Sequence, residues 1–179
     1  MRKRLSKIEK SCLEKSRDSA LLAIETYNKP AVSFKSGGFV VMMVIAYTAL
    51  FHAIFFKRRI KPYYKKKNDY HYKREDGDYK FWELSTCLKK YFRTDTQNPI
   101  RLNLDFFIRL RNKIEHRSFP EIDPNIFGEC QAMLFNYDDL IEKEFGTKWC
   151  LREALSFSLQ LFRSTENLAI NPADNNACF

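Results

Sequence analysis

The feature that most constrains the fold is an uncharged, strongly apolar segment near the start of the chain. It runs from Phe39 to Phe56 as FVVMMVIAYTALFHAIFF, and its length is at the lower limit for a membrane span. Lys57-Arg58-Arg59 follow it, as would suit the cytoplasmic flank of a span. The segment also contains Tyr47, Thr48 and His52, and a helix that is apolar on every side can be the central helix of a bundle. We expect a core helix and no membrane contact, with a membrane-spanning helix as the alternative.

The composition of the chain favours one domain built from long helices. The chain has 179 residues, enough for a single domain with a substantial core, and 45% of them are hydrophobic. Only five glycines and six prolines interrupt them, which is few for a turn-rich β-sandwich. We therefore expect one all-α domain over residues 1–179, a bundle of about five to six helices.

Turn and capping signals divide the chain into elements. Asn28-Lys29-Pro30 ends the first helix, because a residue that precedes proline avoids helical backbone angles. Residues 33–38 form a short connector to the apolar helix, which ends near Arg59, and Gly146 caps the fifth helix. The other helices are expected at residues 6–27, 82–92, 100–117, 125–145 and 149–162. The polar segment 171–179 is expected to fray.

Residues 58–80 form an insertion between helices in which basic and aromatic residues are interleaved. The insertion contains nine lysines and arginines, and Asp76-Gly77-Asp78 is a turn signal that predicts a short β-hairpin or an ordered loop. Lysines beside tyrosines suit phosphate contacts and base stacking. The candidate RNA-binding residues of this segment are Lys65, Lys66 and Lys67. In the alternative, the hairpin is solvated and its tyrosines pack back on the bundle.

Net charge and cysteine usage bear on partners and on the compartment. The formal charge of +9 favours an anionic partner, with nucleic acid first, although a basic protein without such a partner is also possible. The five cysteines are odd in number and include no CxxC pair, so neither a disulfide framework nor a zinc site is indicated. We expect reduced, mostly buried cysteines in a cytoplasmic protein.

The helix expected at residues 100–117 contains a charge in an unusual place. On a helical wheel, Arg111 falls within the arc of about 120° that the apolar residues share. Burying an unpaired guanidinium is costly, so Arg111 must pair with an acid or face a cleft or interface that holds an anion. Glu115, four residues later, is the candidate acid, and a tight pair would make Arg111 structural. The apolar arc consists of Ile100, Leu104, Phe107, Leu110 and Ile114.

The same helix contains a candidate histidine. His116 shares a face with Asn112, but it follows Arg111 by five residues, or about 140° of rotation, so Arg111 and His116 do not converge on one straight helix. Either the helix loosens near His116, because Ser118 and Pro120 follow, or a second copy of the chain brings its own arginine and histidine to the same cleft across a two-fold axis.

The segment Arg111-Asn112-x3-His116 resembles the signature of the HEPN superfamily, which is Arg, a polar residue, a short spacer and then His. The surrounding pattern also fits, because a helix with FFIRLRNKIEHR precedes a further long helix. More of the chain is similar to a prokaryotic family of unassigned function placed near HEPN. The matching pieces are LLAIETYNKP, the apolar VVMMVIAYTALFHAIF and the segment that begins RLRNKIEHRSFPEIDP, and the likeness covers roughly residues 15–160.

The resemblance implies a helical bundle that forms a homodimer and, in active members, metal-independent cleavage of single-stranded RNA that leaves a 2′,3′-cyclic phosphate. By this match Arg111 binds the phosphate, Asn112 orients the phosphate or the imidazole, and His116 transfers the proton. No metal or other cofactor is implied, and the sequence shows no cluster of metal ligands. Basic residues beside the motif are further RNA-binding candidates, namely Arg109, Lys113 and Arg117.

The expected function is therefore that of a toxin or anti-phage defence effector that cuts RNA, silenced by an antitoxin or a regulatory domain. The alternative is a non-catalytic HEPN-like module that binds RNA or a nucleotide, or that serves for dimerisation. The other two histidines are weaker candidates: His52 is expected to be a core histidine with satisfied hydrogen bonds, and His71 belongs to the basic hairpin.

Overall fold

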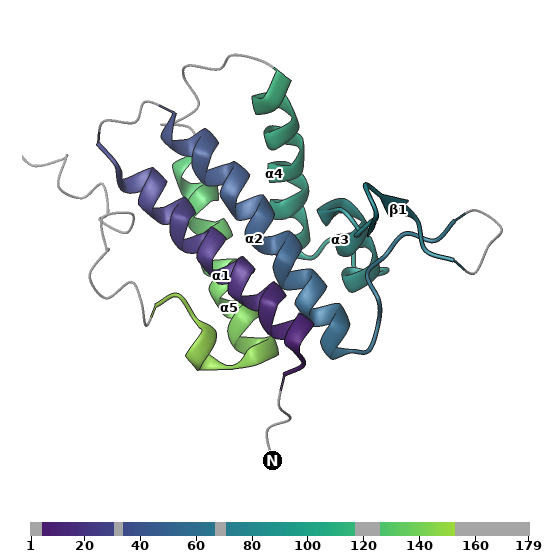
Figure 1. Ribbon diagram of the computed structural model, residues 1–179. Helices are drawn as coiled ribbons and strands as arrows, with labels where there is room; N and C mark the ends of the chain where they lie inside the picture. Colours follow the sequence, from purple (N-terminus) through teal and green to yellow (C-terminus); the bar gives the residue numbers. More distant parts are fainter. Residues whose placement is uncertain (1–4, 31–33, 67–70, 117–125, 153–179) are drawn as a thin grey trace, which may run out of the picture.

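A computed structural model describes residues 5–30, 34–66, 71–116 and 126–152, which contain five α-helices and one short hairpin (Figure 1). The helices are α1 (Lys7–Asn28), α2 (Lys35–Lys57), α3 (Leu84–Phe92), α4 (Pro99–His116) and α5 (Phe127–Phe145). Helices α1 and α2 lie side by side, and α3, α4 and α5 pack on the other sides of α2. The predicted all-α bundle with a small hairpin insertion is confirmed, and α1, α3, α4 and α5 agree closely with the predicted ranges.

The apolar segment forms α2, and α2 is the centre of the core. It contacts α1, α3, α4 and α5, and every residue from Ala49 to Phe55 is buried, which requires that neighbours cover the helix all round. By length and composition alone α2 would also qualify as a membrane span, and 61% of its most apolar window is buried inside the bundle. In this structure the segment therefore occupies the core position that its sequence favoured.

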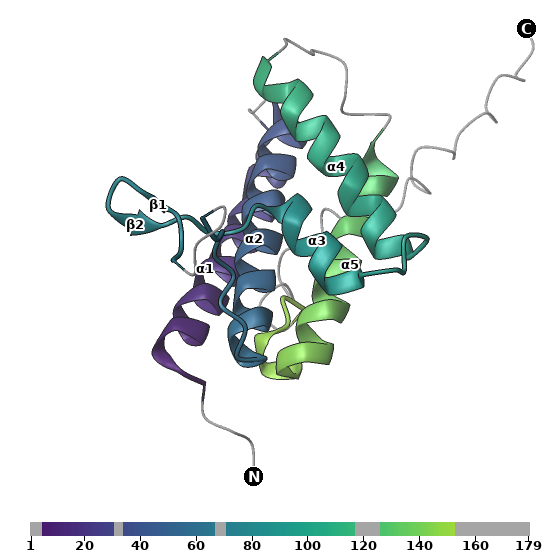
Figure 2. The same ribbon diagram turned by 90° about the vertical axis from the view of Figure 1, so that its right-hand side faces the viewer.

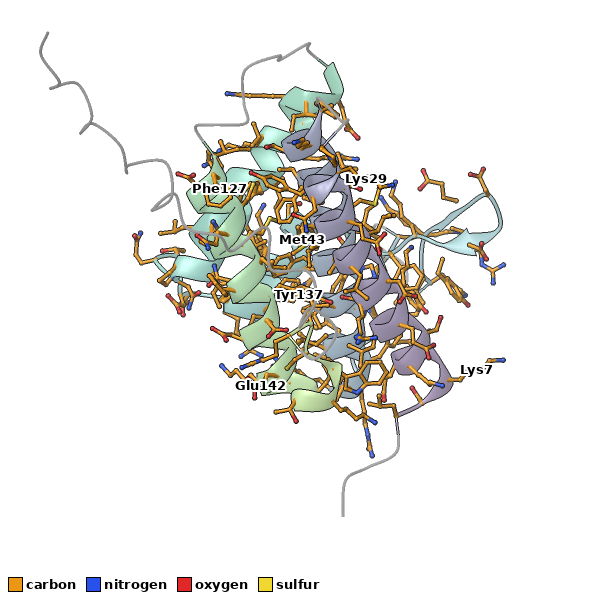
Figure 3. The ribbon with its side chains drawn as sticks, turned by 90° about the vertical axis from the view of Figure 1, so that its left-hand side faces the viewer. Lys7, Lys29, Met43, Phe127, Tyr137 and Glu142 are labelled. Carbon is orange, nitrogen blue, oxygen red and sulfur yellow. The ribbon has the colours of Figure 1, made fainter. Side chains whose placement is uncertain are left out.

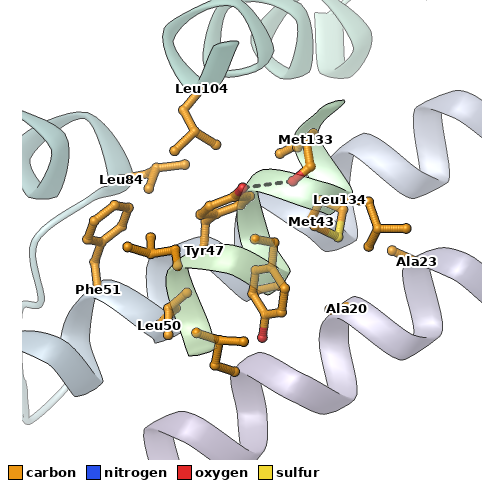
Figure 4. Packing of buried hydrophobic residues seen from close by; sticks show 14 of the residues in the cluster. Ala20, Ala23, Met43, Tyr47, Leu50, Phe51, Leu84, Leu104, Met133 and Leu134 are labelled. Atoms are coloured by element: carbon orange, nitrogen blue, oxygen red, sulfur yellow. Dashed lines mark hydrogen bonds between the residues drawn. The ribbon is translucent and has the colours of Figure 1, made fainter. Parts of the chain in front are cut away.

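Large side chains of α2, α3, α4 and α5 meet in the core (Figure 4). Tyr47, Leu50 and Phe51 of α2 lie among residues of α3, α4 and α5. Burying one such side chain contributes about 1.5–3 kcal/mol, so this cluster is the main source of stability. The neighbouring core residues are Leu84, Leu104, Met133 and Leu134.

Hydroxyl groups connect α1, α2 and α5 inside the core. The Tyr47 hydroxyl donates to the Met133 carbonyl at 2.8 Å, the dashed contact in Figure 4. Ser16 Oγ donates to the Ala46 carbonyl at 2.7 Å and also lies 2.7 Å from the Tyr137 hydroxyl. Because Ser16 is fully buried, both bonds satisfy groups that have no access to water. Figure 3 shows Tyr137 on α5 facing the side of the bundle that α1 covers.

The start of α2 departs from the sequence prediction. Residues 35–38 are helical, whereas the two glycines had indicated a connector. An added Cβ at Gly37 would lie 2.0 Å from the ring of Phe34, and one at Gly38 would lie 2.7 Å from Cγ2 of Thr26 in α1. The glycines therefore allow close packing at the first turn of α2 and against α1, which outweighs their low helix propensity.

The predicted sixth helix does not begin where the sequence placed it. After α5, Gly146 provides the expected cap with a φ of 92°, and Thr147–Trp149 form one 3-10 turn, η2. Residues 150–152 are not helical. The rest of the predicted helix and the segment 171–179 lie outside the described residues.

The insertion contains the predicted hairpin. Strand β1 (Arg74–Glu75) pairs antiparallel with β2 (Asp78–Tyr79), and the two turn residues between them have positive φ angles of 51° and 91°. Positive φ at both positions is typical of a type I′ turn, which the aspartate–glycine pair favours. The hairpin projects from the side of the bundle, as both ribbon views show (Figures 1 and 2).

The aromatic residues of the insertion pack on one another. The ring of Tyr63 lies 4.9 Å from that of Tyr79 and 4.7 Å from that of Phe81, and Phe81 lies 4.8 Å from the ring of His52 in α2. This arrangement agrees with the alternative in which the tyrosines pack back on the bundle, although Tyr79 remains 42% exposed.

Candidate functional site

A pocket of about 650 Å³ lies between α1, α2, α4 and the segment that leads into α3. Its floor follows α2 from Val44 to His52 and is largely apolar. Ligand pockets in proteins commonly have this size and this mixture of apolar surface with few polar groups. The polar and aromatic groups at its edge are Lys15, Phe81, Glu83, Ser85, Arg111 and Asn112.

Helix α4 brings Arg111 and Asn112 to this pocket. Leu104 and Phe107 are fully buried against the core and fix the rotation of the helix, and Arg111 follows one turn later on the border of the same face. Two motif residues from the sequence analysis thus lie at one pocket. The expectation that Arg111 needs a cleft or an acid agrees with the structure in both respects.

The acid is Glu115. Nη2 of Arg111 lies 2.6 Å from Oε1 of Glu115, and Nη1 lies 3.4 Å from Oδ1 of Asn112. Both charged side chains are more than a third exposed, so the ion pair contributes little to stability. A guanidinium has five N–H donors, and these two contacts leave others for an anion in the pocket.

His116 is the last residue of α4, and its side chain lies outside the described part of the structure. The backbone remains helical up to this residue, so the loosening that would bring it toward Arg111 is not observed before the helix ends. On a regular helix the two positions stay about 140° apart. The other arrangement, in which a second copy of the chain brings its own arginine and histidine to the same cleft, stays a prediction.

A different histidine lines the same pocket as Arg111. Nε2 of His52 lies 2.8 Å from the carbonyl oxygen of Trp82. A carbonyl can only accept, so Nε2 donates and the neutral ring keeps Nδ1 as an acceptor. Burial lowers the pKa of His52 below its usual value, and the nearby positive charge of Lys15 lowers it further. His52 is thus the buried, hydrogen-bonded histidine expected, but it also borders the pocket, which the sequence had not indicated.

The predicted RNA-binding lysines and arginines lie elsewhere. Arg109 and Lys113 are exposed on α4, and Lys65 and Lys66 are exposed on the insertion, and none of these four borders the pocket. Lys67 and Arg117 lie outside the described residues. The cation that joins Arg111 at the pocket is instead Lys15 of α1, an exposed lysine in an amphipathic helix that carries no sequence signal of its own.

The described cysteines form no disulfide with one another, and Cys12 borders the pocket. Burial raises the pKa of the Cys12 thiol, so this thiol stays protonated near neutral pH. Within the described residues, no three His, Cys, Asp or Glu side chains are grouped so that they could hold a metal ion.

Comparison with known proteins defines a family but no activity. Searches of the curated proteins and of the solved structures found no match. The family model described as a domain of unknown function (DUF3644) matches residues 11–177, nearly the whole chain. The chain therefore belongs to the DUF3644 family.

Proposed function

We propose that the chain is a metal-independent endoribonuclease of the HEPN type that cleaves single-stranded RNA. Arg111 binds the scissile phosphate, Asn112 orients it, and His116 transfers a proton. A role as a toxin or as an anti-phage defence effector, controlled by an antitoxin or a regulatory domain, would suit this activity. The proposal rests on the resemblance of the motif and on one structural observation, which is the position of Arg111 and Asn112 at a pocket large enough for part of a nucleotide chain.

The chemistry requires only groups that the motif supplies. The 2′-hydroxyl attacks the neighbouring phosphorus, the bond from phosphorus to the 5′-oxygen breaks, and negative charge increases on the other phosphoryl oxygens. A fixed guanidinium stabilises that charge, because charge-assisted hydrogen bonds to phosphate are strong. An imidazole titrates near neutral pH, so its neutral form can accept the 2′-proton and the resulting imidazolium can deliver that proton to the 5′-oxygen, which leaves as the 5′-hydroxyl.

Geometry favours a site shared between two copies of the chain. Because α4 stays helical up to His116, the two motif positions of one chain lie about 140° apart around the helix axis. In a homodimer, His116 of one copy would approach the phosphate that Arg111 of the other copy binds. This arrangement belongs to the proposal, and the mixing experiment in the Discussion tests it.

The decisive experiment incubates the protein with end-labelled single-stranded RNA in EDTA and analyses the product ends. We expect 2′,3′-cyclic phosphate and 5′-hydroxyl ends, and we expect cleavage to fall by about 100-fold or more in Arg111→Ala and in His116→Ala. The control is Lys143→Gln, an exposed lysine on α5 that does not border the pocket. Cleavage that survives both motif substitutions would refute the proposal.

One observation favours a second function, a non-catalytic module that binds RNA. The contact of 2.6 Å between Arg111 and Glu115 pairs the charge of the guanidinium within α4, as in a structural ion pair. RNA binding without cleavage, together with unchanged affinity in Arg111→Ala and His116→Ala, would favour this function over the nuclease.

A further inference from the structure

The pocket extends well beyond Arg111, and its two ends differ in chemistry. Its floor on α2 extends from Val44 to His52, and these eight helical steps correspond to about 12 Å along the helix axis. Both ribbon views show the C-terminal end of α4 beside the N-terminal half of α2 (Figures 1 and 2). The insertion and the start of α3 approach the other end, where His52 bonds to the Trp82 carbonyl. A bound phosphate at Arg111 would leave most of this length unoccupied.

The end opposite Arg111 offers hydrogen-bond acceptors and an aromatic ring, and the ammonium group of Lys15, whose charge acts on His52, adds a donor that suits the RNA backbone phosphate. Nδ1 of His52 is an acceptor, because Nε2 donates to the Trp82 carbonyl at 2.8 Å. Glu83, exposed at the start of α3, adds a carboxylate, which accepts only. The ring of Phe81 lies 4.8 Å from the His52 ring and is 36% exposed, so a base can contact it.

Hydrogen-bond acceptors in a pocket favour bases that carry hydrogen-bond donors. Adenine, cytosine and guanine each carry an exocyclic amino group, whereas the one N–H donor on the pairing edge of uracil lies between two carbonyl oxygens that a carboxylate repels. Aromatic rings contribute to the binding of any base by stacking and do not discriminate strongly. The hydrogen-bond acceptors therefore determine which base this end of the pocket prefers.

We propose that the end of the pocket formed by Glu83, His52 and Phe81 is a base subsite, and that it selects an RNA nucleotide with an exocyclic amino group beside the phosphate held by Arg111. This inference rests on the proposed function for the identity of the ligand as RNA. It adds the part of the RNA that the pocket recognises, and it assigns roles to residues outside the Arg111–His116 motif.

Binding of short RNA oligonucleotides in EDTA tests the subsite separately from cleavage. The probes are 2′-O-methyl pentamers of adenosine, cytidine and uridine, which cannot be cleaved because they lack the attacking hydroxyl. We expect the adenosine and cytidine pentamers to bind about tenfold more tightly than the uridine pentamer, as the loss of one hydrogen bond to a charged group implies. Equal affinity for all three pentamers would overturn the proposal.

Two substitutions assign the preference to the subsite. Glu83→Gln replaces an acceptor by an amide that can also donate, so the preference for adenosine over uridine should fall to within about twofold. Glu83 makes no side-chain cap to α3, so this change should leave folding intact. His52→Gln keeps a donor for the Trp82 carbonyl, and we expect it to reduce the same preference at an unchanged melting temperature. The control is Glu25→Gln, an exposed acid on α1 that does not border the pocket.

The outcomes separate the subsite from the nuclease. A base preference that Glu83→Gln abolishes, in a protein that cleaves no RNA, would support the subsite and count against the proposed cleavage. Cleavage that depends on Arg111 but proceeds equally on adenosine and uridine substrates, with Glu83→Gln unchanged, would support the nuclease and overturn the subsite.

Discussion

Removing the Ser16 hydroxyl should destabilise the bundle more than the small size of this group suggests. Ser16 Oγ uses its single hydrogen to bond the Ala46 carbonyl at 2.7 Å, so in its contact of 2.7 Å with Tyr137 the tyrosine donates. Burial raises the pKa of Tyr137, which keeps that donor protonated. Ser16→Ala removes two hydrogen bonds and leaves the buried Tyr137 donor without an acceptor. We expect a loss of about 2–3 kcal/mol in the free energy of unfolding.

A double-mutant cycle measures this coupling. Tyr137→Phe removes the orphaned donor as well as the bond, so we expect it to cost about 1 kcal/mol alone and to cost almost nothing when added to Ser16→Ala. The two sites should therefore couple by about 1 kcal/mol in urea unfolding monitored by circular dichroism. Thermal melts should show Ser16→Ala lower by roughly 4–12 °C for a domain of this size. Costs that add to within about 0.3 kcal/mol would refute the assigned donor and acceptor.

Three further predictions test the site and the packing. Glu115→Gln frees Arg111 for phosphate, so RNA affinity should rise about threefold, measured by fluorescence anisotropy, while stability changes by less than about 1 kcal/mol. Because the folded-state pKa of His52 lies below the ordinary 6.5, its neutral form is fully stabilising above pH 6.5, and this contribution is lost as the pH falls through the folded-state pKa. The free energy of unfolding, measured against pH, should fall in that range, and it should fall less in His52→Gln than in the wild type. A Cβ at Gly38 would lie 2.7 Å from a methyl carbon of α1, whereas one at Gly128 would meet nothing within 4 Å. Gly38→Ala should therefore cost about 1–3 kcal/mol in urea unfolding, and Gly128→Ala should stabilise by up to about 1 kcal/mol.

Each of these predictions has an outcome that contradicts it. Unchanged or weaker RNA binding in Glu115→Gln would mean that the carboxylate does not compete with phosphate for Arg111. An equal fall in stability with pH in the wild type and in His52→Gln would assign the acid sensitivity to other groups. Equal effects of alanine at Gly38 and Gly128 would show that the first turn of α2 has room for a side chain.

Local signals in the sequence were enough to predict most helices. Ser6 begins α1 with a capping box, in which its hydroxyl accepts from the backbone of Glu9 at 3.3 Å, and Pro30 follows the end of the helix. The predicted start of α2 was wrong, because glycines such as Gly37 and Gly38 have a low helix propensity and favour a connector. Their helical conformation depends on close packing against Phe34 and α1, and such tertiary contacts are not visible in a local pattern.

The candidate site was only partly accessible to sequence reasoning. The position of Arg111 within an apolar arc correctly indicated that it needs a partner, and the structure provides both Glu115 and the pocket. Lys15 and His52 were missed because they belong to helices distant in sequence, and no local pattern states which helix faces will meet. His52 in particular looked like any core histidine, since its burial and its hydrogen bond are those of a packed residue.

The location of His116 in the site can be decided by mixing two inactive variants. If the arginine and the histidine of each site come from different copies, a dimer of one Arg111→Ala chain and one His116→Ala chain contains one intact site and one doubly mutated site. Random exchange places half of all chains in such mixed dimers, so RNA cleavage should recover to about a quarter of the wild-type rate. Each variant alone should remain inactive.

Two sites that each lie within one chain predict a different result. Every site in the mixed dimer then lacks one motif residue, so mixing restores no cleavage. Helix α4 is regular up to His116 and holds the two motif positions about 140° apart, which is why we expect recovery. Co-refolding from denaturant ensures that the chains exchange, and a wild-type sample refolded in the same way sets the reference rate. A mixture as inactive as its components, beside an active reference, would mean that His116 reaches Arg111 within its own chain and that α4 must unwind at its end to allow it.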